Sequence, residues 1–558
     1  MTRITSFLDP AGKISHFARV GGFLTMEKSL FRVILALAIV AATQSAPASQ
    51  LNMFFTNTGV EYSATNTWIT IQRGQNPSTA PTQENVPAVT YGANQFVWNT
   101  YTNVLGTNTQ VGNLFANSVL LQDINAAGGL TWTSNAPSAV VYISYGAPLP
   151  VSNYSLSGIS PSATSDASYN IPYTTVELTY YGGNANDQGD ITAINYFTAP
   201  VRVSNYASTN ATGTPISTVG FNPTAPATAA MLSQFQQITG GSTNTILSNT
   251  NGQITRVLGP TQFGAGQPNA ADFGGFTNFG TYFGSLTNTT TVFSNQSGYN
   301  TVQTPGTNVA YTNANVVFVL TNQVSSTTNG YAFTATGDIT TTKIGYDVGG
   351  TPISTNVHVS TNVVFAVTPA AGESELAAAF TYYGDYSPST NITMGGSGWA
   401  DFTNTIAGFV DGGNNPAANI VRAQIPGELS AGYSAGFPGS TNTVAQFGST
   451  NLGSLPSGEW WNLNPVVAFA DVQSTNGFFN EYANIIYQNS SNSVYGMTYS
   501  DRFNNGSPYV SAAPSVGSWL VELGDPLHAV PEPAFAVATI VFFIGFAAYK
   551  GRIRRKKA

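Results

Sequence analysis

The sequence contains no cysteine, and it has little histidine and few basic residues. Without cysteine there are no disulfide bonds, so a hydrophobic core must hold the fold. Histidine occurs only at His16, His358 and His528, which excludes zinc or copper sites built from several histidines and cysteines. A Ser-His-Asp triad would have to use His358, which we interpret as a structural residue of a strand. Any chemistry should therefore rest on carboxylates, and we predict no cofactor and no metal.

Basic residues are concentrated at the two ends of the chain. Between residues 49 and 528, six Lys or Arg residues remain against 22 Asp or Glu residues, a formal charge of −16 compared with −8 for the whole chain. A body this acidic repels nucleic acid and acidic polysaccharides. The composition predicts no nucleic-acid partner and favours a neutral glycan, although solubility with few lysines explains the same charge.

Long apolar runs are absent except near the ends. At the N-terminal end, residues 26–32 are a basic segment (MEKSLFR), residues 33–42 are apolar, and Ala46-Pro47-Ala48 offers small residues for cleavage. We therefore predict a signal region over residues 1–48, with the signal peptide itself at 26–48. Residues 1–25 leave two alternatives open, a translation start at Met26 or a long segment before the apolar run.

The C-terminal end carries Pro531-Glu532-Pro533, then an apolar run over 534–549, then a basic tail (KGRIRRKK). The run is at the short end for a membrane span, and the basic residues behind it would stay in the cytoplasm. This order resembles the PEP-CTERM sorting signal, which exosortases read in bacteria that make exopolysaccharide. The resemblance implies a sorting signal over 529–558 with a transmembrane segment at 534–549, an exosortase partner, and a protein exported to the cell surface or beyond after transient anchoring in the inner membrane. An ordinary C-terminal anchor is the alternative.

The body, residues 49–528, has enough apolar and aromatic residues to build a core. Most of it reads as strands between turn residues: 140–145 is nearly continuous apolar, and 176–180 alternates with Glu177 on the polar face. Helices are predicted at 226–238, at 481–488, and around 373–383 and 415–425. These patterns predict a mainly β fold, with a β-sandwich or barrel domain, a smaller α+β domain and a ligand cleft between them.

Several segments of the body, in order, resemble glycoside hydrolase family 64. They are 139–149 (AVVYISYGAPL), 175–180 (TVELTY), 189–197 (GDITAINYF), 480–486 (NEYANII) and 495–501 (YGMTYSD). The resemblance extends over nearly the whole body and implies a thaumatin-like fold and hydrolysis of β-1,3-glucan.

Carried over residue by residue, the resemblance makes Glu177 one catalytic carboxylate. Where the family has its second acid, this chain has Asn195, which cannot titrate and so cannot act as a general acid or base. Asp190 and Asp501 are the alternatives for the second carboxylate, with Asp187 as a further substitute. On one continuous strand Asp190 would lie on the opposite face from Asn195, so it could serve only if it sits in the turn before that strand.

Asn195 and the aromatic residues Tyr180, Tyr196 and Tyr499 are expected to bind the sugar, although core packing is the commoner role of any single aromatic residue. Three functions remain open: a β-1,3-glucan hydrolase, a non-catalytic glucan-binding or matrix-binding protein of the same fold, and an unrelated Asn/Thr-rich adhesin. A second carboxylate within about 10 Å of Glu177 would favour hydrolysis.

Overall fold

A computed structural model of the chain describes residues 50–73, 89–97, 114–133, 136–151, 159–263, 275–276, 280–287, 289–294, 299–300, 311–327, 330–346, 352–367, 392–395, 431–463, 479–497 and 508–527. The predicted signal region, the tail over 529–558 and the helices predicted around 373–383 and 415–425 lie outside these residues. The described helices include none that is long and apolar enough to cross a membrane.

The first of two large sheets, sheet A, joins the two ends of the described body. Its central strand β1 pairs in parallel with β23, the last strand, and antiparallel with β7. Leu51, Met53 and Phe55 of β1 alternate with more exposed residues, so they all point to one face. In spatial order the strands are β13 (Ser217–Gly220), β12 (Val201–Tyr206), β23 (Ser518–Leu523), β1 (Leu51–Asn57), β7 (Leu130–Trp132), β3 (Val89–Tyr91) and β4 (Asn94–Gln95).

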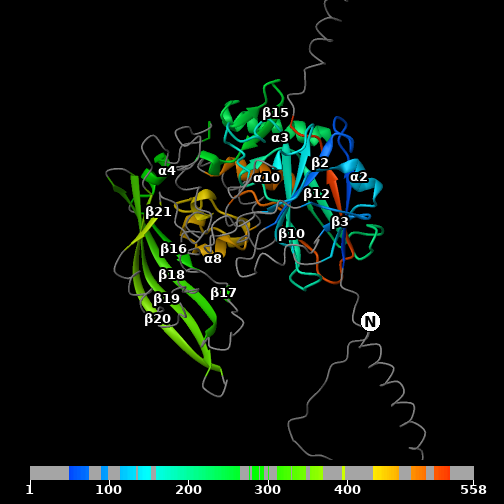
Figure 1. Cartoon of the computed structure of the whole chain (residues 1–558). Helices are drawn as coiled ribbons and strands as arrows, with labels where there is room; N and C mark the ends of the chain where they lie inside the picture. Colours follow the sequence, from blue (N-terminus) through cyan, green and yellow to red (C-terminus); the bar gives the residue numbers. More distant parts are fainter. Residues whose placement is uncertain are drawn as a thin grey trace, which may run out of the picture. The chain divides into compact units, whose positions relative to one another are not determined.

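The second large sheet, sheet B, includes β2 and β10, which are labelled in Figure 1. It is antiparallel throughout its described pairings. In spatial order its strands are β22 (Tyr509–Ser511), β10 (Gln188–Asp190), β9 (Tyr173–Tyr180), β8 (Ala136–Tyr145), β2 (Thr67–Arg73) and β5 (Leu114–Phe115), with β6 (Val119–Leu120) also paired to β2. A short helix, α2 (Leu121–Ala126), follows β6. The strands predicted at 140–145 and 176–180 are thereby confirmed as parts of β8 and β9.

Sheets A and B bury their inner faces in one hydrophobic core. Val141 of β8 and Val176 and Leu178 of β9 belong to the same cluster as Met53 of β1 and Val203 of β12. Their other faces point outward, so each sheet has one apolar face and one face that can carry polar residues. The expectation of a mainly β fold is confirmed.

A small third sheet and two helices extend this core. The sheet contains β11 (Tyr196–Phe197), β15 (Ile254–Leu258) and β14 (Ile246–Ser248), followed by the 3-10 helix η3 (Pro260–Phe263). The predicted helices at 226–238 and 481–488 are confirmed as α3 (Ala225–Thr239) and α10 (Glu481–Ser490). Gly240 ends α3 in the left-handed conformation, and the Asn480 side chain caps the N-terminus of α10.

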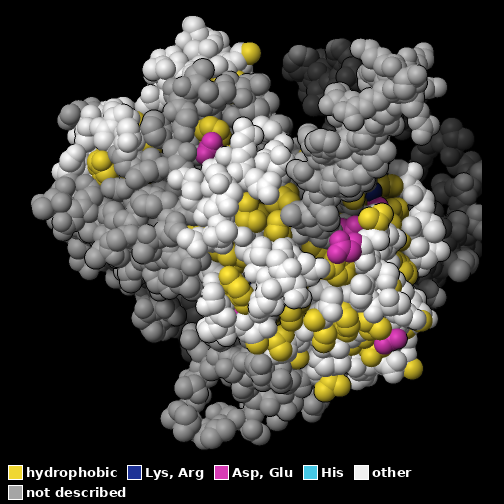
Figure 2. Space-filling model, turned by 90° about the horizontal axis from the view of Figure 1, so that it is seen from above, with side chains coloured by type: hydrophobic (Ala, Val, Ile, Leu, Met, Phe, Trp, Pro, Cys, Tyr) yellow, Lys and Arg dark blue, Asp and Glu magenta, His cyan; other side chains and the backbone are white. Residues whose placement is uncertain are grey.

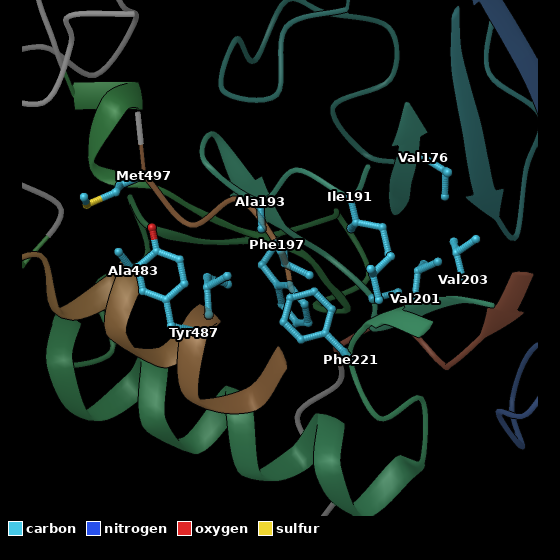
Figure 3. Close-up of a cluster of buried hydrophobic side chains, with 14 of the residues drawn as sticks. Val176, Ile191, Ala193, Phe197, Val201, Val203, Phe221, Ala483, Tyr487 and Met497 are labelled. Carbon is cyan, nitrogen blue, oxygen red and sulfur yellow. The ribbon is translucent and has the colours of Figure 1, made fainter. Parts of the chain in front are cut away.

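Aromatic rings connect these elements to the large sheets. The rings of Phe197 and Phe221 lie 5.0 Å apart, and Phe235 of α3 lies 5.3 Å from Tyr482 of α10. Figure 3 shows Phe197 and Phe221 beside α10, with Val201 and Val203 of β12 on the side toward Val176. The packing fixes β11, and with it Tyr196, next to sheet B.

The fourth sheet is built from long antiparallel strands. It contains β16 (Thr290–Ser294), β18 (Tyr311–Thr327), β19 (Gly330–Tyr346), β20 (Pro352–Val367) and β21 (Ile392–Gly395), with β17 (Tyr299–Asn300) paired to β18. His358 lies on β20, as the sequence predicts. The other helices in the described part of the chain are α4 (Gly280–Ser285), η4 (Ala445–Phe447), η5 (Leu452–Ser454) and α8 (Ser457–Trp460).

The surface reflects the low charge content of the chain. On the face shown in Figure 2, most described side chains are uncharged, acidic groups occur at a few separate places, and very little basic surface is visible. Charged residues are therefore rare enough on this protein that any two of the same sign in direct contact require an explanation.

Candidate active site

Two carboxylates face each other across neighbouring strands of sheet B. In the antiparallel pairing of β9 with β10, Glu177 lies directly opposite Asp190. Residues in this relation point to the same face of the sheet, with their β-carbons about 4.5–5.5 Å apart. The structure therefore brings together Glu177 and one of the two acids considered as its partner.

The same register defines a row of side chains across five strands. Asp190 pairs with Tyr509 of β22, Glu177 with Val140 of β8, and Val140 with Gln72 of β2. We call these five residues, Tyr509, Asp190, Glu177, Val140 and Gln72, the carboxylate row. All five are partly exposed, so the row runs across the sheet at its surface.

The row lies on the outer face of sheet B. Val176 and Leu178, on either side of Glu177, are buried in the main core, so Glu177 must point the other way. This outer face has its own small apolar cluster, formed by Phe115, Tyr142, Leu149 and Tyr173. Part of the outer face is thus packed, and the row lies beside that packed part.

Burial and like charge both act on the two carboxylates. Within the described part of the chain, neither side chain has a hydrogen bond or an ion pair to another residue. Burial raises the pKa of Glu177. Burial raises the pKa of Asp190 well above its usual value, and the negative charge of Glu177 raises it further. Asp190 is therefore the member of the pair that holds its proton to higher pH.

Gly189 allows the two strands to approach. It lies opposite Leu178, and a β-carbon at this position would collide with the carbonyl oxygen of Glu177 and with the indole of Trp519. Only glycine leaves room for both groups. The spacing of Glu177 and Asp190 thus depends on a residue that carries no functional group.

Asn195 lies in a different environment from the pair. Its Oδ1 atom accepts hydrogen bonds from Oγ1 of Thr261 (3.0 Å) and Nε2 of Gln262 (3.2 Å), so its side chain is tied to η3. The alternation argument about Asp190 and Asn195 assumed one continuous strand, and this condition is not met. Asp190 ends β10 and Tyr196 begins β11, which belongs to another sheet, so no continuous strand joins Asp190 to Asn195.

Tyr196 borders the carboxylate row. Its ring lies 5.2 Å from that of Tyr173, and its hydroxyl lies near Thr175. Thr175 precedes Glu177 by two residues on the same face of β9, a distance of about 7 Å along the strand. The position is compatible with the substrate contact expected for Tyr196.

The other predicted site residues are placed differently. Tyr180 is completely buried in the main core because it lies on the inner face of β9, so its side chain cannot contact a ligand on the outer face. Asp187 is buried and accepts hydrogen bonds from the backbone N–H groups of Tyr181, Gly183 and Asn184, which is the turn-capping role. Tyr499 and Asp501 lie outside the described residues.

A buried arginine supports one side of this region. Arg256 of β15 is completely buried, and its guanidinium donates hydrogen bonds to the carbonyl oxygens of Pro161, Ser168, Tyr169 and Ile171. The same guanidinium lies 4.3 Å from the centre of the Tyr173 ring. It therefore fastens the segment before β9 to β15.

No sequence pattern pointed to Tyr509 or Gln72 as site residues. Each is joined to Glu177 only through strand pairing, and Tyr509 is more than 300 residues away in the sequence. Their strands contain alternating patterns, but alternation shows only which face of the sheet a side chain is on. It does not show which strand lies next to it. Within the described residues, no group of three or more His, Asp or Glu side chains gathers as metal ligands do, and the row offers carboxylates for acid–base chemistry.

Comparisons with known proteins give only distant likenesses. No protein-family model matches the sequence, and no curated protein matches it. Among solved structures, a β-1,3-glucanase domain (GH64) from Clostridium beijerinckii is 13% identical, with a TM-score of 0.40, over 85% of this chain and 98% of that one. A laminaripentaose-producing β-1,3-glucanase in complex with laminaritetraose is also 13% identical, with a TM-score of 0.44, over 86% of this chain and 98% of that one. At these scores the likenesses carry no argument about this chain.

Proposed function

We propose that the protein hydrolyses β-1,3-glucan, with Glu177 and Asp190 as its two catalytic carboxylates. The observation that carries the proposal is the direct opposition of these side chains on the outer face of sheet B. Hydrolysis of a glycosidic bond needs two such groups, one that donates a proton and one that stays ionised. The β-carbons of the two residues are about 4.5–5.5 Å apart. Their carboxyl groups are therefore close enough to meet the limit of about 10 Å between carboxylates that favours a hydrolase.

The two groups differ in the way this chemistry requires. Asp190 has the higher pKa because of its burial and the charge of Glu177, so it is the proton donor to the leaving oxygen. Glu177 is the carboxylate that ionises first and acts on the sugar carbon, as a nucleophile or through a water molecule. Tyr196 and Tyr509 flank the pair and would contact neighbouring sugar units.

The substrate class follows from the resemblance of the sequence to glycoside hydrolase family 64, together with the thaumatin-like fold that this resemblance implies. The acidic body is compatible with a neutral polysaccharide, since a chain with −16 net charge over 49–528 would repel an acidic one.

The proposal also includes export, because the two ends of the chain resemble a signal peptide and a PEP-CTERM signal. We expect exosortase to remove the basic tail after transient membrane anchoring through 534–549. Mass spectrometry of the mature protein checks this expectation, and recovery of peptides beyond Arg552 would favour a permanent anchor.

A glucan-binding protein without catalysis is the second candidate. Asn195 favours it, because an amide stands where glycoside hydrolase family 64, which the sequence resembles, has an aspartate. If the protein only binds glucan, wild type should bind laminarin and release no reducing ends, and Asn195→Asp should create activity. The structure instead ties Asn195 to Thr261 and Gln262, which favours a structural role for the amide.

The deciding experiment measures reducing ends released from laminarin by wild type, Glu177→Gln and Asn195→Asp. The hydrolase proposal expects activity in wild type and its loss in Glu177→Gln, while binding to laminarin persists because the amide keeps the shape of the side chain. Asn195→Asp should leave activity unchanged or lower it. Wild type that is fully active and unaffected by Glu177→Gln would show that the residue assignment is wrong.

A further inference from the structure

Gln72 ends the carboxylate row on the side away from Asp190. It is separated from Glu177 by a single strand, β8, whose residue in the row is Val140. Two strand spacings put Gln72 about 10 Å from Glu177. A ligand that lies along the row from the carboxylate pair would therefore pass over Val140 and reach Gln72.

The side chain of Gln72 is held in place by Tyr142. The Tyr142 hydroxyl donates a hydrogen bond of 2.8 Å to Oε1 of Gln72. The Tyr142 ring is itself fixed, with the rings of Phe115 and Tyr173 at 6.2 and 5.8 Å. This contact orients the amide and occupies its oxygen.

The amide nitrogen of Gln72 is left as a donor. Among the described residues it has no hydrogen-bond partner, and the Gln72 side chain is partly exposed. Thr70, two residues earlier on the same face, shows the contrasting arrangement: it is completely buried and hydrogen-bonded to Ser118. A polar group that is oriented on one side and open on the other is suited to a ligand.

We propose that Gln72, oriented by Tyr142, binds a hydroxyl group of the neutral sugar unit that lies over Val140, next to the scissile bond. This inference rests on the function proposed above. A pyranose has apolar C–H faces and polar hydroxyl edges, which match an apolar residue beside a neutral donor. Because the amide is uncharged, it can bind the sugar without changing the charge balance of Glu177 and Asp190.

The test compares kcat/KM on laminari-oligosaccharides for wild type, Gln72→Leu, Tyr142→Phe and the double variant. Loss of one neutral hydrogen bond to the substrate should lower kcat/KM about three- to tenfold in Gln72→Leu. Tyr142→Phe should lower it by no more than that, and it should have no further effect in the Gln72→Leu background, since Tyr142 acts through Gln72. The pH profile should keep both of its limbs.

Gln95→Leu is the matched control, because Gln95 is an exposed strand glutamine on β4 of sheet A. Equal kcat/KM for Gln72→Leu and Gln95→Leu, or additive losses in the double variant, would overturn the role of Gln72 and leave the hydrolase proposal standing. Wild type that neither binds nor cuts the oligosaccharides would overturn both proposals.

Discussion

The outer faces of sheets A and B each carry a pair of charged residues directly opposite each other. One pair combines opposite charges, and the other combines two negative charges. On sheet A, Arg202 of β12 lies opposite Glu522 of β23, and the guanidinium binds the carboxylate through two contacts of 2.6 Å. On sheet B, Glu177 lies opposite Asp190, and two like charges meet.

The difference separates a pair that supports the fold from one that does not. Opposite charges across neighbouring strands stabilise a sheet, whereas like charges directly opposite each other destabilise it. The chain has few charged residues, so an acid pair without a countercharge among the described residues is unlike its surroundings. A costly arrangement of this kind, with pKa values shifted by burial and like charge, is typical of a catalytic site.

The largest expected effect is on the pH dependence of hydrolysis. Glu177→Gln and Asp190→Asn should each lower kcat about 10²–10⁴-fold, since each removes a group that transfers a proton or attacks the sugar. Wild type should show a bell-shaped profile, with loss of activity at low pH as Glu177 is protonated and at high pH as Asp190 ionises. Residual activity of Asp190→Asn should lack the high-pH limb. Glu522→Gln, which breaks the pair on sheet A, serves as the control and should keep the wild-type profile.

The spacing of the acid pair can be changed without touching either acid. In Gly189→Ala the new methyl group pushes against the Glu177 carbonyl and Trp519, so β10 must move away from β9. A misplacement of about 1 Å can cost on the order of 100-fold in rate, and we expect a loss of kcat of up to this size. Gly284→Ala is the control, because Gly284, like Gly189, has no left-handed backbone, and a β-carbon there would meet only the Tyr331 hydroxyl, at 3.4 Å. Similar rates in the two variants would contradict the positioning role of Gly189.

Replacing Arg256 or Arg202 tests how much a buried and a partly exposed arginine each contribute to the free energy of unfolding. Arg256→Met leaves four carbonyl oxygens without their donor in a buried position, which should cost about 2–4 kcal/mol of unfolding free energy. Arg202→Met breaks only a partly exposed ion pair and should cost about 1 kcal/mol or less. Urea unfolding measures both, and equal losses would show that the buried hydrogen bonds of Arg256 contribute little.

The smallest expected effect is on stability: removing a charge should stabilise the protein at the acid pair and destabilise it at the Arg202–Glu522 pair. A carboxyl whose pKa is raised in the folded state binds its proton more tightly there than in the unfolded chain. Wild type should therefore lose stability as the pH rises from about 4, the ordinary pKa of Asp, through the raised pKa of Asp190. Asp190→Asn should weaken this dependence, leaving the contribution of Glu177, whose pKa burial also raises, and it should be more stable than wild type at neutral pH. Glu522→Gln should instead be slightly less stable there, and a destabilised Asp190→Asn would refute the account of the acid pair.

Local patterns predicted individual elements well. The strand containing Glu177 and the two helices α3 and α10 follow from alternation, from Pro226 at the start of α3, and from the glycines after it. Tyr180 shows the limit of the same reasoning: it was expected at the sugar, but its place in the alternation puts it in the core with Val176 and Leu178. The argument about opposite faces of one strand does not apply to Asp190 and Asn195, because the chain leaves sheet B between them.

The sequence by itself determined that Glu177 faces outward, because the side chains of a strand alternate with a period of two and the residues beside Glu177 are apolar. It also limited the chemistry to be expected, since no cysteine and few histidines leave carboxylates as the main candidates for acid–base groups. Only the tertiary structure decided which acid meets Glu177. Strand pairing brings Asp190, Tyr509, Val140 and Gln72 into one row from four separate segments, and register is a property of two strands together, which neither strand's own pattern contains.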